Sequence, residues 1–77
     1  MEWRGRIVTN PAVLLGKPAL RDTRLAVVFL LDLLSSGWTY EQIRNHYPAV
    51  TGDDLLACLA YEKEVLRRER PRPSARP

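Results

Sequence analysis

The chain has 77 residues, enough for one small domain, whose core alone gives only marginal stability. Its single cysteine, Cys58, excludes an internal disulfide, and its longest apolar block, residues 25–34, is far shorter than the ~20 residues of a membrane-spanning helix. The net charge of +3 divides into −1 for residues 1–66 and +4 for residues 67–77. The chain opens without the apolar stretch of a signal peptide, so we expect a soluble cytoplasmic protein.

The first elements are predicted to be short and extended. Residues 6–9 alternate and are β-prone, and Asn10-Pro11 indicates a turn. Gly16-Lys17-Pro18 indicates a second turn, in which Pro18 excludes a helix. We therefore expect a small β-hairpin or β-arm at the N-terminus. Strands this short are unstable alone and must lie on an apolar surface.

Residues 26–36 are predicted to form that surface as a helix, with Gly37 as the C′ residue that ends it. Apolar residues cover every side of this helix, and such a helix is expected to be buried all round. A chain of this size has few elements with which to surround it. We therefore predict a homodimer whose interface uses Val27, Val28, Phe29, Leu31 and Leu34.

Two further helices are predicted. Thr39 and Gln42 have the form of a capping box, which indicates a helix over residues 40–47 that ends before Pro48. Thr51 is a natural N-cap for a third helix, and Asp53 with Asp54 in its first turn suits the helix dipole.

The third helix is predicted to bury a stripe of leucines and to fray near residues 67–70. Its water-facing side chains are expected to be Glu62, Lys63 and Glu64. The buried stripe is expected to contain Leu55, Leu56, Leu59 and Leu66. The predicted fold class is therefore mainly α. Residues 1–66 are expected to form a three-helix, helix-turn-helix domain with an N-terminal β-arm, and residues 67–77 a frayed or disordered Arg/Pro-rich tail.

Catalysis is poorly supported by the residue types present. His46 has no cysteine or carboxylate at metal-ligand spacing, and we expect it to interact with the C-terminal end of its helix. Cys58, between Ala57 and Leu59, is expected to be a small buried apolar residue. The chain also has no glycine-rich phosphate loop. We therefore expect no enzymatic activity, no metal and no cofactor.

Seven short motifs follow one another along the chain in a characteristic order. No single motif is distinctive, but their order and spacing together are. They are Ile7 to Pro11, Gly16-Lys17-Pro18, Arg21-Asp22-Thr23-Arg24-Leu25, Gly37-Trp38-Thr39, Glu41 to Ile43, Tyr47-Pro48 and Thr51 to Leu55.

Over residues 7–64 this pattern resembles the prokaryotic domain of unknown function 433, described as an antitoxin family. The resemblance implies a homeodomain-like helix-turn-helix fold and the role of antitoxin in a type II toxin–antitoxin pair. The antitoxin would neutralise a PIN-like ribonuclease and could repress its own promoter. Two departures from the family pattern are Leu15 and Asp22, which stand where the family usually has glycine. Because Asp tolerates a left-handed backbone better than most residues, the turn at Asp22 is expected to survive.

Two function classes remain open: an antitoxin, and a stand-alone DNA-binding regulator without a toxin. The acidic start of the third helix argues against its insertion into the major groove of double-stranded DNA. The candidate DNA contacts are therefore Arg4, Arg6, Arg21 and Arg24, the last two of which have an alternative role as anchors of the β-arm. The candidate toxin contacts are the tail arginines Arg67, Arg68, Arg70, Arg72 and Arg76.

Overall fold

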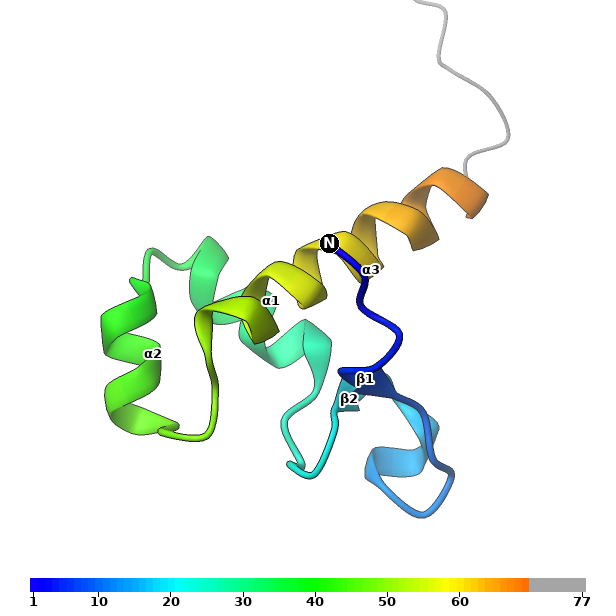
Figure 1. The fold of residues 1–77 in the computed structure, drawn as a ribbon, viewed down its shortest axis with the longest axis horizontal. Coiled ribbons are helices and arrows are strands. Elements are labelled where there is room, and N and C mark those ends of the chain that lie inside the picture. The colour runs from blue at the N-terminus through cyan, green and yellow to red at the C-terminus, as the bar shows by residue number, and fades with distance from the viewer. Residues whose placement is uncertain (70–77) are drawn as a thin grey trace, which may run out of the picture.

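The computed structural model describes residues 1–69 and has the predicted mainly α architecture, in which a short antiparallel hairpin precedes three helices (Figure 1). Its elements are β1 (Ile7–Val8), the 3-10 turn η1 (Leu14–Gly16), β2 (Ala19–Leu20), α1 (Val27–Ser35), α2 (Tyr40–His46) and α3 (Gly52–Glu69).

The hairpin is pinned to the helices by buried side chains and by backbone hydrogen bonds. β1 and β2 pair with Ile7 opposite Leu20 and Val8 opposite Ala19. Both Ile7 and Leu20 lie in the core. Ala19 also forms an antiparallel bridge with Ala26, at the start of α1. The predicted arm is therefore confirmed, and it is continuous with the entry to α1.

Helix α1 ends as the sequence predicts. Gly37 has φ +96°, and the backbone N–H groups of Gly37 and Trp38 donate to the carbonyls of Leu34 and Leu33. These two bonds make a Schellman motif, in which glycine takes the left-handed position at no steric cost.

Helices α2 and α3 both begin with a side chain that caps the backbone. The capping box at Thr39 and Gln42 is present as predicted. At α3 the Thr51 hydroxyl accepts from Asp54 N–H at 3.1 Å, and Asp54 accepts from Thr51 N–H at 2.9 Å. The predicted N-cap is therefore confirmed, and Asp54 serves as its reciprocal partner.

The core lies where the three helices and the hairpin meet. Its largest fully buried side chains are Leu30 of α1, Ile43 of α2, Cys58 of α3 and Val50, which lies in the loop between α2 and α3. Within residues 1–69, no helix is both long and apolar enough to span a bilayer.

Two burial predictions are wrong. Helix α1 is not buried all round, because the Val28 side chain is 53% exposed. On α3, of the four predicted leucines only Leu55 is buried, alongside Ala57 and Cys58; Leu56, Leu59 and Leu66 are 53%, 50% and 56% exposed. The small residues Ala57 and Cys58 lie on the side of α3 that faces the body, and the three exposed leucines project on the opposite side.

Candidate interaction surfaces

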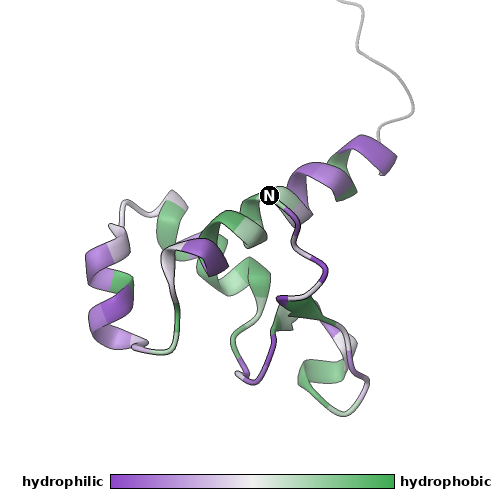
Figure 2. Cartoon of the chain, viewed as in Figure 1, coloured by the Kyte–Doolittle hydropathy of each residue, from purple (hydrophilic) through white to green (hydrophobic). Residues whose placement is uncertain are grey.

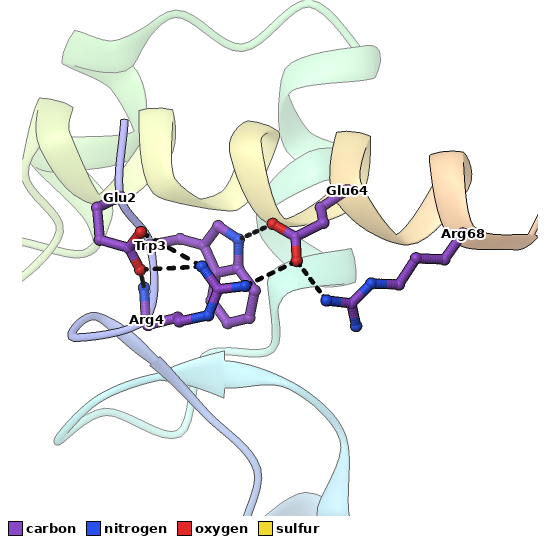
Figure 3. Close-up of polar contacts among 5 residues, drawn as sticks. All are labelled: Glu2, Trp3, Arg4, Glu64 and Arg68. Carbon is purple, nitrogen blue, oxygen red and sulfur yellow. Dashed lines mark hydrogen bonds and ion pairs between the residues drawn. The ribbon is translucent and has the colours of Figure 1, made fainter.

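Hydrogen bonds to the Glu64 side chain join the N-terminal segment to α3 (Figure 3). The Glu64 carboxylate accepts from Trp3 Nε1 at 3.1 Å, from Arg4 Nη2 at 2.9 Å and from Arg68 Nη2 at 2.7 Å. The Trp3 ring also packs edge-to-face on Tyr61, with centroids 4.7 Å apart. Glu64 was predicted to face water and is instead half-buried, because the N-terminal segment lies over it.

Two ion pairs also join Arg6 to the first turn of α3. Arg6 Nη1 lies 3.0 Å from Asp54 Oδ1, and Arg6 Nη2 lies 3.6 Å from Asp53 Oδ2. The Asp54 side chain is 16% exposed and that of Asp53 is 63% exposed. The structure therefore places two of the candidate DNA contacts, Arg4 and Arg6, against carboxylates of α3.

The other two candidates lie at the turn after β2, where the Arg21 backbone N–H donates to the Arg6 carbonyl at 2.8 Å. Arg21 Nη1 donates to the Gly5 carbonyl at 3.2 Å, which ties the turn to the N-terminal segment. Arg24 is exposed, and the described residues show no hydrogen bond or ion pair from its side chain. Arg21 and Arg24 line an open groove of about 820 Å³ between the hairpin strands and the turn, and Asp22 lies between them. An anchoring contact is thus present for Arg21, and Arg24 is available to a ligand.

The exposed leucines of α3 form a continuous surface that the sequence analysis missed. We define the outer leucine face as Gly52, Leu56, Leu59, Lys63 and Leu66, which follow one another at intervals of four and three residues. This interval was a readable signal in the sequence, because it repeats every 3.5 residues as in a coiled-coil seam. Figure 2 shows that α3 is hydrophilic at both ends, with hydrophobic segments between them.

The predicted dimer interface on α1 is only partly accessible. Val27 is 2% exposed and belongs to the chain's own core, so it cannot contact a partner and its assignment is wrong. Phe29, Leu31 and Leu34 are half-buried against the core, and Phe29 packs edge-to-face on Tyr47. Val28 is the exposed member of the set.

The basic tail begins on the helix. α3 continues through Glu69, so residues 67–69 of the predicted tail are helical, and Arg67 and Arg68 are exposed at the end of α3 that projects beyond the rest of the body (Figure 1). The remaining tail candidates, Arg70, Arg72 and Arg76, lie outside the described residues.

The single cysteine is buried in the core, and the single histidine contacts its own helix and a neighbouring ring. Cys58 is fully buried, and burial, followed by the nearby Asp54 carboxylate, raises the pKa of its thiol to about 11. His46 Nδ1 donates to the Gln42 carbonyl at 3.1 Å, and its ring packs on Trp38. Residues 1–69 contain no cluster of three or more His, Cys, Asp or Glu side chains arranged to hold a metal ion.

The family model for the protein of unknown function DUF433 matches residues 7–61. The chain belongs to the DUF433 family. The fold is similar to the crystal structure of a DUF433 member protein from Anabaena variabilis ATCC 29413, with a TM-score of 0.74 and 27% sequence identity. The similarity covers 82% of this chain and 62% of that one, so this chain spans less than two thirds of the length of the solved relative. No curated protein matches the chain significantly.

The two expected departures from the DUF433 pattern occur where the backbone favours glycine. Leu15 has φ +57° and Asp22 has φ +61°, both in the left-handed region. The turn at Asp22 is formed as expected. The Leu15 side chain is 92% exposed, so its left-handed backbone is not compensated by burial.

Proposed function

We propose that this DUF433 protein is the antitoxin of a type II toxin–antitoxin pair, which binds a PIN-like ribonuclease through its basic C-terminal segment. The observation that carries the proposal is the separation of charge. A nearly neutral domain, net −1 over residues 1–66, holds a segment of net +4 at the projecting end of α3. The resemblance to an antitoxin family supplies the class of partner.

The chemistry of such a partner suits this segment. A metal-dependent nuclease gathers carboxylates around its metal ions, and an inserted guanidinium would pair with those carboxylates and displace the metal. Arginine is well suited to this, because its planar fork binds a carboxylate through two parallel hydrogen bonds.

The test is co-expression with the neighbouring gene, followed by co-purification and a ribonuclease assay. The informative variant replaces Arg70, Arg72 and Arg76 with glutamine and leaves every residue of the described domain unchanged. The matched control replaces the same three arginines with lysine, which keeps the charge. We expect the glutamine variant to lose neutralisation and the lysine variant to retain much of it. Full neutralisation by the glutamine variant would show that these arginines are not the inhibitory element.

A second candidate function, a DNA-binding regulator without a toxin, is favoured by Arg21 and Arg24 at the hairpin groove. Two features weigh against other DNA contacts: the acidic first turn of α3 disfavours its insertion into the major groove, and carboxylates of α3 already pair with Arg4 and Arg6.

Fluorescence anisotropy with the promoter fragment tests this alternative. If the groove binds phosphate, the Arg21→Gln/Arg24→Gln variant weakens binding. The slope of the logarithm of the binding constant against the logarithm of salt concentration should also fall in magnitude by about two. The matched control is Arg44→Gln, an exposed arginine on α2. Equal loss from both variants would indicate non-specific attraction.

A further inference from the structure

The outer leucine face has the geometry of a helix-pairing seam. Leu56, Leu59 and Leu66 are each about half exposed on one side of α3, where the body of the protein does not cover them. At the start of this face Gly52 has no side chain, and the ring of Tyr40 lies about 4.0 Å from the position that its Cβ would take. Leu56 and Leu59 are neighbours on this face, and Leu66 follows on the same side two turns further along the helix, so the exposed leucines gather on one side of α3 and are not scattered singly.

We propose that the outer leucine face pairs with the same face of a second copy of this chain, with the two α3 helices antiparallel. The seam spacing of four and three residues is the pattern by which two helices interdigitate at a crossing angle near 20°. α3 has 18 residues, or roughly 27 Å of helix, which is long enough for such a seam. This inference does not depend on the proposed function, because it requires neither a toxin nor the tail.

The charges of α3 select a second copy in antiparallel orientation. Lys63 lies within the seam, so a parallel pair would bring Lys63 of each copy together, which is repulsive. In an antiparallel pair centred midway between Leu56 and Leu59, residues 52 and 63 are equally far from the centre. The partner's Lys63 then lies over the first turn of α3, beside Asp53. The leucines that pair in this register are Leu56 and Leu59 of each copy, because Leu66 lies level with residue 49, which precedes the partner's α3.

The flank of the seam agrees with this orientation. Asp53, Ala60 and Arg67 follow at intervals of seven residues along one edge of the face. In an antiparallel pair this edge meets its own copy, and in the register given above Asp53 lies near the partner's uncharged Ala60, so no like charge opposes it. Asp53 is accessible to the partner's Lys63, since its side chain is 63% exposed and its ion pair with Arg6 is 3.6 Å long. The face is thus complementary to itself in charge, through Lys63 and Asp53.

A seam built on one helix from each copy is smaller than the ~800 Å² per partner of a standard interface. We therefore expect a weak dimer, with a dissociation constant on the order of 10–100 μM.

Sedimentation equilibrium of the full chain from about 5 to 500 μM tests the proposal. The wild type should pass from monomer to dimer over this range, and a purely monomeric mass at the highest concentration would overturn the proposal. Leu56→Glu should raise the dissociation constant by about 30-fold or more, because it buries a carboxylate without a partner. The matched control is Val28→Glu, since Val28 on α1 is exposed to the same 53% as Leu56. Dimer loss in Val28→Glu but not in Leu56→Glu would place the interface on α1 and reject the α3 seam.

A charge swap tests the orientation. Asp53→Lys and Lys63→Glu should each weaken the dimer about 3–10-fold, and the double variant should recover most of the affinity if the helices are antiparallel. Circular dichroism of each variant checks that the monomer remains folded. If the double variant does not recover, or Lys63→Glu alone strengthens association, the antiparallel pairing is wrong.

Discussion

Asp54 binds Arg6 with one carboxylate oxygen and caps its own helix with the other. Oδ1 accepts from Arg6 Nη1 at 3.0 Å, and Oδ2 accepts from Thr51 N–H at 2.9 Å. One side chain thus joins the N-terminal segment to the start of α3 and closes the cap of that helix. The remaining exposure of the Asp54 side chain is low, so water screens the pair less than it screens Asp53.

The first prediction concerns this pair. Arg6→Gln and Asp54→Asn should each lower the free energy of unfolding by about 1 kcal/mol, with a coupling of about 0.5–1 kcal/mol in the double-mutant cycle. Urea unfolding, monitored by circular dichroism, measures the free energy of unfolding of the wild type, the two single variants and the double variant. Asp53→Asn is the control and should cost less than about 0.5 kcal/mol, because that side chain is largely exposed. Additive single effects would show that Arg6 and Asp54 do not stabilise one another.

The second prediction is that Leu15→Gly stabilises the protein. Leu15 has φ +57° and its side chain is almost fully exposed, so glycine removes backbone strain and loses little packing. Removal of the strain should raise the free energy of unfolding by about 1 kcal/mol. The greater conformational entropy of glycine in the unfolded chain offsets part of this gain.

Two alanine substitutions calibrate this measurement. A Cβ on Gly37 would meet nothing within 4 Å, but φ is +96°, so Gly37→Ala should destabilise by about 1 kcal/mol through the backbone alone. Gly5 also has open space and carries no such φ, so Gly5→Ala should be close to neutral. Destabilisation by Leu15→Gly would mean that the exposed leucine makes a contact that offsets its strain.

The third prediction concerns pH. Burial raises the pKa of the Cys58 thiol from its ordinary value of 9.0 to about 11 in the folded protein. Between these values the unfolded chain loses its thiol proton while the folded chain keeps it. The stability that the neutral thiol provides is therefore complete below about pH 9 and is lost as the pH rises toward 11.

Unfolding free energies at pH 8, 9, 10 and 11 test this, compared with Cys58→Ala. The two proteins differ only at residue 58, so the difference between the two slopes isolates the thiol. We expect the wild type to lose about 2 kcal/mol more than the variant across this range. Parallel slopes would place the thiol in a more polar setting than the structure shows.

The fourth prediction concerns Glu64, which holds Trp3, Arg4 and Arg68 together. Glu64→Ala should cost about 1–2 kcal/mol and shift the tryptophan emission to longer wavelength as Trp3 detaches from α3. Glu64→Gln keeps an acceptor for Trp3 Nε1 and should cost less. Glu62→Ala, two residues before Glu64 on the same helix, is the control and should leave the emission unchanged.

Local signals in the sequence were sufficient to predict the elements. Thr39 with Gln42, Thr51 with two acids after it, and Gly37 after a run of leucines each act within one helical turn, so their outcome does not depend on the rest of the fold. The same holds for Asp22, whose left-handed backbone follows from the turn it occupies.

Burial could not be predicted in the same way, because it depends on what packs against each face. The leucines of α3 were assigned to the core for their hydrophobicity, yet Ala57 and Cys58 are the residues that let α3 approach the body. Arg4 and Arg6 were candidate DNA contacts for their charge, yet they bind Glu64 and Asp54 across about 60 and 48 residues of sequence. No local pattern encodes partners at such separations.

The docking of Trp3 on Glu64 also fixes when the fold can be completed. These residues are 61 positions apart, so their contact closes a loop that contains most of the described residues. On the ribosome, α1 and α2 emerge before their α3 partner exists, and Trp3 must wait unattached until residue 64 has left the exit tunnel. The N-terminal segment, although it is made before α3, is therefore among the last to reach its native position.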